Sequence, residues 1–95
     1  MFLQVTEAHY LDAYRIEVVF NNGKKGIADL VDALNGPVFE PLKNPEAFAS
    51  FKVDPDLETI VWENGADLAT EYIYYQTFKN EASLQAQFKE WGYVK

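Results

Sequence analysis

Apolar and polar residues alternate along the first thirty positions with the two-residue period of β-strands. The alternation is clearest over 14–20, where one face is predicted to carry Tyr14, Ile16, Val18 and Phe20. A weaker alternation over 3–10, rich in Val, Thr and Tyr, predicts a strand before it, with a turn at 11–13. The Asn-Asn-Gly run at 21–23 tolerates positive φ and predicts a hairpin turn into a third strand over 24–29. We therefore expect a three-stranded antiparallel meander.

The segment after the meander holds short elements separated by prolines and glycines. Ile27 is expected to be the main apolar contact of the third strand. One helical turn is predicted over 30–34, with Asp29 as its N-cap and an Asn-Gly pair at its end. Residues 37–41 include two prolines, which lack a backbone N–H. This stretch is therefore expected to run extended along a sheet edge, anchored by its two apolar side chains.

A helix start is predicted at Asn44-Pro45-Glu46, because Asn caps well, Pro suits the first helical position and Glu complements the helix dipole. The helix is expected to run to about Phe51. Two short strands are predicted next, over 52–54 and 59–62. The second has the Thr, Ile, Val and Trp content of a buried strand, and a turn at 63–65 follows it.

The C-terminal tail has a helical pattern. From Asn80 onward, apolar residues recur at i, i+4 and i+7, which predicts an amphipathic helix that ends near Gly92. Before it, Asp67 or Thr70 could cap another helical turn. Residues 72–78 leave two alternatives open, because the tyrosines favour a strand and the uninterrupted run into the tail favours a helix.

Together these patterns predict an α+β fold: a three-stranded antiparallel meander, a short helix, one or two short strands and a C-terminal helix. We expect one domain over 1–95. It consists of a core over 1–74 and a helical extension over 75–95. The predicted core residues are apolar positions on these elements: Val5, Ile16, Val18, Phe20, Ile27, Phe39, Phe48, Phe51, Ile60 and Trp62.

Charge and composition narrow the possible functions. The net charge is −7, and Arg15 is the only arginine, so we expect no direct nucleic-acid binding and an electrostatic preference for a basic protein partner. The chain has no cysteine, which excludes disulfides and thiolate metal sites. No segment has the roughly 20 apolar residues of a membrane helix, and the first seven residues lack the pattern of a signal peptide. We expect a cytoplasmic protein.

Three groups of polar residues are candidate sites of chemistry. Asp54, Asp56 and Glu58 could supply oxygens to a hard cation, but Asp beside Pro is also a common turn former, and we favour the turn. Asp67 is better explained as a cap or turn residue than as a lone catalytic carboxylate. His9, the only histidine, is expected either on a strand surface or partly buried. We therefore predict no catalytic residue, no metal site, no cofactor and no enzymatic activity.

Aromatic residues are concentrated toward the C-terminus. Core packing is the favoured interpretation, and an aromatic interaction surface is the alternative. The residues of this alternative surface lie on the 72–78 segment and on the tail helix: Tyr72, Tyr75, Phe78, Leu84, Phe88 and Trp91.

Five local patterns occur together in an order that resembles one bacterial family. They are Val5-Thr6-Glu7-Ala8 with Tyr10-Leu11-Asp12; Asn21-Asn22-Gly23; Gly36-Pro37-Val38-Phe39-Glu40-Pro41-Leu42; Phe51-Lys52-Val53-Asp54; and Thr59-Ile60-Val61-Trp62 with Asn64-Gly65-Ala66-Asp67-Leu68. In this combination the chain resembles DUF2442, a domain of unknown function, over about 1–74. The chain departs from the family pattern at Thr70, where relatives typically have Pro, and in its tail.

The resemblance implies a small α+β domain with no established activity and no defined catalytic residues. Some members of the family are fused to a helix-turn-helix domain, for which this tail is too short. Many lie beside another small domain, DUF4160, in an arrangement that looks like a toxin–antitoxin pair. We therefore expect a protein-interaction module with a small basic partner, such as the acidic half of such a pair. The alternatives are a homodimeric structural or regulatory domain, with the tail helix or an edge strand as interface, and a small-ligand or cation-binding protein or enzyme that uses surface carboxylates.

Overall fold

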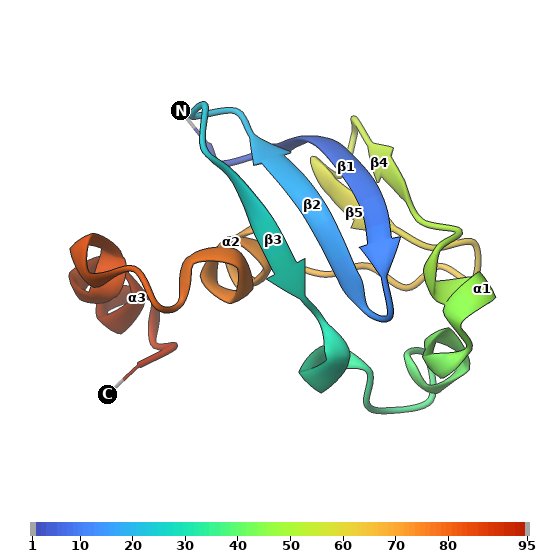
Figure 1. Ribbon diagram of the computed structural model, residues 1–95. Helices are drawn as coiled ribbons and strands as arrows, with labels where there is room; N and C mark the ends of the chain where they lie inside the picture. The colour runs from blue at the N-terminus through green and yellow to red at the C-terminus, as the bar shows by residue number, and fades with distance from the viewer. Residues whose placement is uncertain (1, 95) are drawn as a thin grey trace.

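Three antiparallel strands form the larger sheet, in the order β1 (Val5–Asp12), β2 (Arg15–Phe20) and β3 (Lys25–Asp29) (Figure 1). The computed structural model describes residues 2–94. The predicted meander is confirmed, although its first strand begins and ends two residues later than expected. Asp12 pairs with Arg15 in the β-ladder, and their side chains form an ion pair at 2.7 Å. The turn therefore occupies 13–14 rather than the predicted 11–13.

The inner face of this sheet is apolar. Ile16, Val18 and Phe20 are fully buried on β2, as predicted. On β3 the prediction for Ile27 was wrong, since its side chain is 46% exposed and Ala28 is the buried residue. Neighbouring residues of a strand point to opposite faces, and the ladder aligns Ile16 with Ala28. Ile27 therefore lies on the outer face.

The connection after β3 is made of 3₁₀ turns rather than extended chain. The 3₁₀ helix η1 spans Val31–Ala33, and its N-cap is Leu30 rather than the predicted Asp29. The Asp29 side chain still accepts a hydrogen bond from the Val31 N–H at 3.2 Å, from one residue before the cap. The expectation of an extended edge over 37–41 was wrong. A turn leads there into a second 3₁₀ helix, η2 (Glu40–Lys43), which Pro41 suits because early helical positions need no N–H. Its buried anchor is Leu42.

Helix α1 (Pro45–Phe48) begins where the sequence predicted. The Asn44 side chain accepts a hydrogen bond from the Glu46 N–H at 2.9 Å. The helix ends at Phe48, three residues before the predicted end, and a turn follows it. Strands β4 (Lys52–Asp54) and β5 (Thr59–Val61) then pair antiparallel as a second sheet beside β1 (Figure 1).

The last part of the chain is helical, which decides the open question over 72–78. Helix α2 (Thr70–Phe78) packs against β3, and a 3₁₀ turn, η3 (Ala82–Leu84), leads into α3 (Gln85–Trp91). Gly92 ends α3 in the left-handed conformation, as predicted. Neither Asp67 nor Thr70 caps α2. Asp67 instead forms an isolated bridge with β5, and Ala69 precedes α2 without a side-chain cap.

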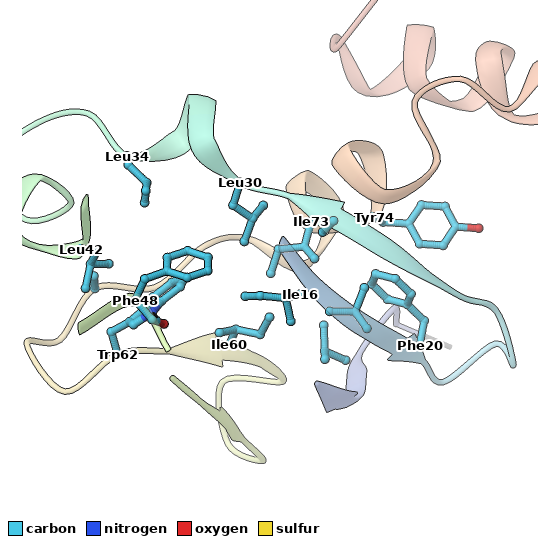
Figure 2. Close-up of a cluster of buried hydrophobic side chains, with 14 of the residues drawn as sticks. Ile16, Phe20, Leu30, Leu34, Leu42, Phe48, Ile60, Trp62, Ile73 and Tyr74 are labelled. Atoms are coloured by element: carbon cyan, nitrogen blue, oxygen red, sulfur yellow. Dashed lines mark hydrogen bonds between the residues drawn. The ribbon is translucent and has the colours of Figure 1, made fainter. Parts of the chain in front are cut away.

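One core joins both sheets to the helices (Figure 2). Of the predicted core residues, Phe39 and Phe51 are only half-buried, and Ile27 is exposed. The buried apolar residues that the prediction missed come mainly from the connection after β3 and from the helices: Ala28, Leu30, Leu34, Leu42, Val61, Ala66, Ile73, Tyr74 and Phe88. Phe48 and Trp62 lie together at one end of this core, and Phe20 and Tyr74 lie at the other (Figure 2).

Candidate functional site

The aromatic residues predicted to form an interaction surface are brought together by α2 and α3. The Tyr75 ring lies 5.1 Å from the Phe88 ring and stacks on Tyr93 at 4.9 Å. Trp91 lies 6.0 Å from Phe88. The cluster thus docks α3 onto α2 within one chain.

Burial decides how much of this cluster a partner could contact. Phe88 is fully buried, whereas Tyr72, Tyr75, Phe78, Leu84 and Trp91 are half-buried. In this conformation Phe88 packs inside its own chain, so α3 offers no continuous apolar stripe. An interaction role for the five half-buried side chains remains a prediction.

Tyr93 is a member of the cluster that the sequence patterns did not identify. Burial raises the pKa of its phenol, and the nearby Glu71 carboxylate raises it further. Its ring also lies 6.0 Å from Tyr72. It follows the left-handed Gly92, which reverses the chain, so periodicity along a helix gave no signal for it.

The acidic segment between β4 and β5 forms a turn. Asp54 Oδ1 accepts hydrogen bonds from the N–H groups of Asp56 at 2.8 Å and Leu57 at 3.2 Å. Glu58 then takes a positive φ of 63°. The Asp54 side chain thus satisfies backbone donors, as expected for a turn former. Within 2–94, no three carboxylate or histidine side chains gather in the way a metal site requires.

The outer face of the larger sheet carries charged and polar residues. His9 is exposed on β1 and lies opposite Glu17 of β2, which in turn lies opposite Ile27 of β3. A parallel row contains Glu7, Val19 and Lys25. No helix or strand overlies this face in Figure 1. This face is therefore open to a partner.

A surface cleft of about 340 Å³ lies between the β2–β3 turn and the two C-terminal helices. Its wall includes the amides of Asn21 and Asn22, the Glu71 carboxylate and the rings of Tyr74 and Trp91. Amide groups and aromatic faces could hold a small polar ligand. Asn22 Nδ2 donates to the Tyr74 hydroxyl across a long 3.4 Å, so these polar groups already partner one another.

Few of the carboxylates are neutralised inside the chain. The sequence has 15 Asp and Glu residues, all within 2–94, and only two ion pairs occur there: Asp12–Arg15 and Glu40–Lys43. Both pairs are exposed and join residues three positions apart. The Arg15 guanidinium holds the pKa of Asp12 below its usual range through a bidentate hydrogen bond. Thirteen carboxylates therefore lack a cationic partner within the described chain.

These features define a small α+β domain with an uncovered, charged sheet face and a C-terminal helix docked by aromatic contacts. The chain belongs to the DUF2442 family, whose members are proteins of unknown function, and the family's pattern matches residues 5–79. The match extends to the end of α2, so α3 lies outside it.

One solved structure shows the same fold. It is the crystal structure of a protein from Nitrosomonas europaea ATCC 19718 that its authors describe as a putative DNA-binding protein. The TM-score is 0.75 at 18% sequence identity, and the likeness covers all of this chain and 64% of that one. The present chain therefore spans less than two thirds of its length. No curated protein matches the chain in sequence.

No helix among residues 2–94 has the length and apolar character needed to cross a bilayer.

Proposed function

We propose that this domain is a non-enzymatic protein-interaction module that binds a small basic protein, in the manner of the acidic member of a toxin–antitoxin-like pair. The observation that supports this proposal is the acidic surface. The net charge is −7, and most carboxylates of the described chain form no ion pair. A surface of this sign attracts a basic partner and accelerates its association.

The outer sheet face is the binding surface in this proposal. Glu7, Glu17 and Asp29 lie there beside Lys25, which forms no ion pair within residues 2–94, whereas Arg15 binds Asp12. The strands hold the backbone of these residues in fixed positions, so binding has to order only their side chains. The half-buried Val19 and the exposed Ile27 supply apolar contact between the charges.

Direct nucleic-acid binding is not part of the proposal. Phosphate contacts depend on Lys and Arg, and this chain has 8 of them against 15 acidic residues. The description of the Nitrosomonas protein applies to a chain that is longer than this one. We propose a cytoplasmic location, where a gene neighbour's product would meet the domain.

The test is capture from lysate of the native cell with the tagged chain at low salt, followed by elution as salt is raised. The proposal expects one stoichiometric basic protein, which is then purified for binding measurements. The double variant Glu7→Gln/Glu17→Gln should release it at lower salt, and the control Glu81→Gln/Glu90→Gln, on the exposed tail, should not. Capture of no basic protein overturns the function. If both double variants release the partner at the same salt concentration, the binding surface is not the outer sheet face.

A further inference from the structure

Asparagine is followed by glycine at three places in the chain: Asn22-Gly23, Asn35-Gly36 and Asn64-Gly65. In such a pair the backbone nitrogen of the glycine can attack the side-chain amide carbon of the asparagine, because glycine has no Cβ to obstruct the approach. All three asparagines are exposed. The three glycines have φ values of 86°, 90° and 86°, with open space where a Cβ would lie. Sequence, exposure and backbone conformation therefore do not distinguish the pairs.

Backbone hydrogen bonds protect two of the three glycine nitrogens. The Gly23 N–H donates to the Phe20 carbonyl, and the Gly65 N–H donates to the Trp62 carbonyl, each at 3.0 Å. The nitrogen has to lose this proton before it attacks, so each bond has to be broken first. Attack is therefore opposed at Gly23 and Gly65.

The same two pairs also have their asparagine side chains held in place. Asn22 Oδ1 accepts a hydrogen bond from the Lys24 N–H at 3.0 Å, and Asn64 Oδ1 accepts one from the Ala66 N–H at 3.1 Å. These Asx turns fix the side-chain amide on the residue after the glycine. Rotation of the amide carbon toward the glycine nitrogen breaks the turn.

The Asn35-Gly36 pair has neither protection. Within 2–94 the Gly36 N–H donates to no acceptor, and Asn35 Oδ1 accepts no hydrogen bond. The Asn35 side chain makes one bond, from Nδ2 to the Asp32 carbonyl at 2.8 Å. Asn64 Nδ2 makes an equivalent bond to the Val38 carbonyl at 2.8 Å, so this bond does not account for a difference between the two pairs.

We propose that Asn35 is a site of spontaneous deamidation in the folded protein, and that Asn22 and Asn64 are protected from the same reaction. A base removes the Gly36 N–H proton, and the nitrogen forms a bond to Asn35 Cγ. The Cγ–Nδ2 bond then breaks, and Nδ2 leaves as ammonia with one added proton. Water opens the resulting succinimide to aspartate or isoaspartate. The reaction requires no oxidant, no enzyme and no partner protein.

The product changes both charge and packing at the end of η1. A carboxylate at position 35 makes the net charge of −7 more negative by one and cannot donate to the Asp32 carbonyl. The position directly follows Leu34, which is buried in the core. Deamidation should therefore weaken the anchoring of η1. Asn35→Asp should unfold at a lower urea concentration than Asn80→Asp, which adds the same charge at another exposed asparagine. Equal midpoints overturn this consequence.

Peptide mass spectrometry of the folded chain, after incubation in mildly alkaline buffer, measures the three deamidation rates. Trypsin places the pairs on separate peptides, because Lys24, Lys43 and Lys52 lie between them. Asn35 should convert about tenfold faster than Asn22 and Asn64, whose hydrogen bonds add to the barrier. In urea these bonds are lost, so all three should convert at similar rates. Equal rates in the folded chain, or an unchanged order in urea, overturn the proposal.

Isoelectric focusing of two variants gives a second measurement on the whole chain. Glutamine at position 35 would have to close a larger and less favourable ring, so Asn35→Gln should slow the accumulation of acidic species. Asn80→Gln is the control, because Asn80 is exposed and is followed by Glu81 rather than glycine. Acidic species that accumulate equally fast in both variants overturn the proposal.

Discussion

The indole N–H of Trp62 donates a hydrogen bond to the backbone carbonyl of Phe48 at 2.8 Å. Trp62 follows β5, and Phe48 ends α1, so this buried bond joins the second sheet to the helix that covers one end of the core. The two rings also lie 5.7 Å apart. Their contact positions the middle of the chain against the meander.

Trp62→Phe should therefore destabilise the fold. Phenylalanine lacks the indole N–H, so the buried carbonyl of Phe48 loses this hydrogen bond. An unsatisfied buried carbonyl lowers the free energy of unfolding by about 1–3 kcal/mol. Urea unfolding followed by circular dichroism measures the loss. Trp91→Phe is the matched control, because Trp91 is half-buried at the end of α3. An equal loss in both variants would show that ring volume, rather than the hydrogen bond, is responsible.

Gly26→Ala should destabilise the packing of α2 on β3. A Cβ at this position would lie 2.6 Å from Thr77 Cγ2 and 3.0 Å from Phe78 Cε1. Forcing such contacts apart costs roughly 1–3 kcal/mol in the free energy of unfolding. Adding Thr77→Ser should recover most of the loss, since serine lacks the methyl group and keeps the hydroxyl that donates to the Ile73 carbonyl. If the double variant is no more stable than Gly26→Ala, the close approach is not the cause.

Phe88→Ala should undock α3 from α2. Phe88 is fully buried, and its removal costs about 3–5 kcal/mol when the cavity does not collapse. Hydrogen exchange should show increased exchange across Gln85–Trp91 and little change in β2. Gln87→Ala, at an exposed position of the same helix, is the control. Unchanged protection of α3 in Phe88→Ala would contradict docking through this side chain.

The stability of the fold should decline at alkaline pH through Tyr93. Its pKa is raised in the folded state by burial and by the Glu71 carboxylate. A raised folded pKa stabilises the fold below the unfolded value of about 10, and this contribution is lost as the pH rises through the folded pKa. Unfolding measured from pH 8 to above pH 10 should show a shallower decline in Tyr93→Phe than in the wild type. Identical pH profiles would exclude a contribution from this phenol.

The meander, the helix start at Asn44 and the end of α3 at Gly92 could be predicted from the sequence. Each rests on a local rule: alternation in a strand, a side chain that accepts from a backbone N–H, and a left-handed residue without a Cβ. Such features require only neighbouring residues. They hold whatever the rest of the chain does.

Ile27 shows where local reasoning failed. Its size suggested a core residue, but the ladder places Gly26 and Ala28 on the inner face, where their small side chains leave room for α2. The burial of each face depends on a helix about fifty residues further along the chain. Periodicity over a five-residue strand cannot contain that information.

For the candidate surfaces, too, some features follow from the sequence and others only from tertiary packing. The sequence alone determined the acidic charge, the strand order of the meander and the aromatic content of the tail. Only the tertiary structure decided that Phe88 docks α3 within its own chain and that Lys25, Ile27 and Asp29 are exposed on one face of β3. The physical reason is that charge and local propensity belong to residues and their neighbours, whereas burial depends on which distant segments pack together.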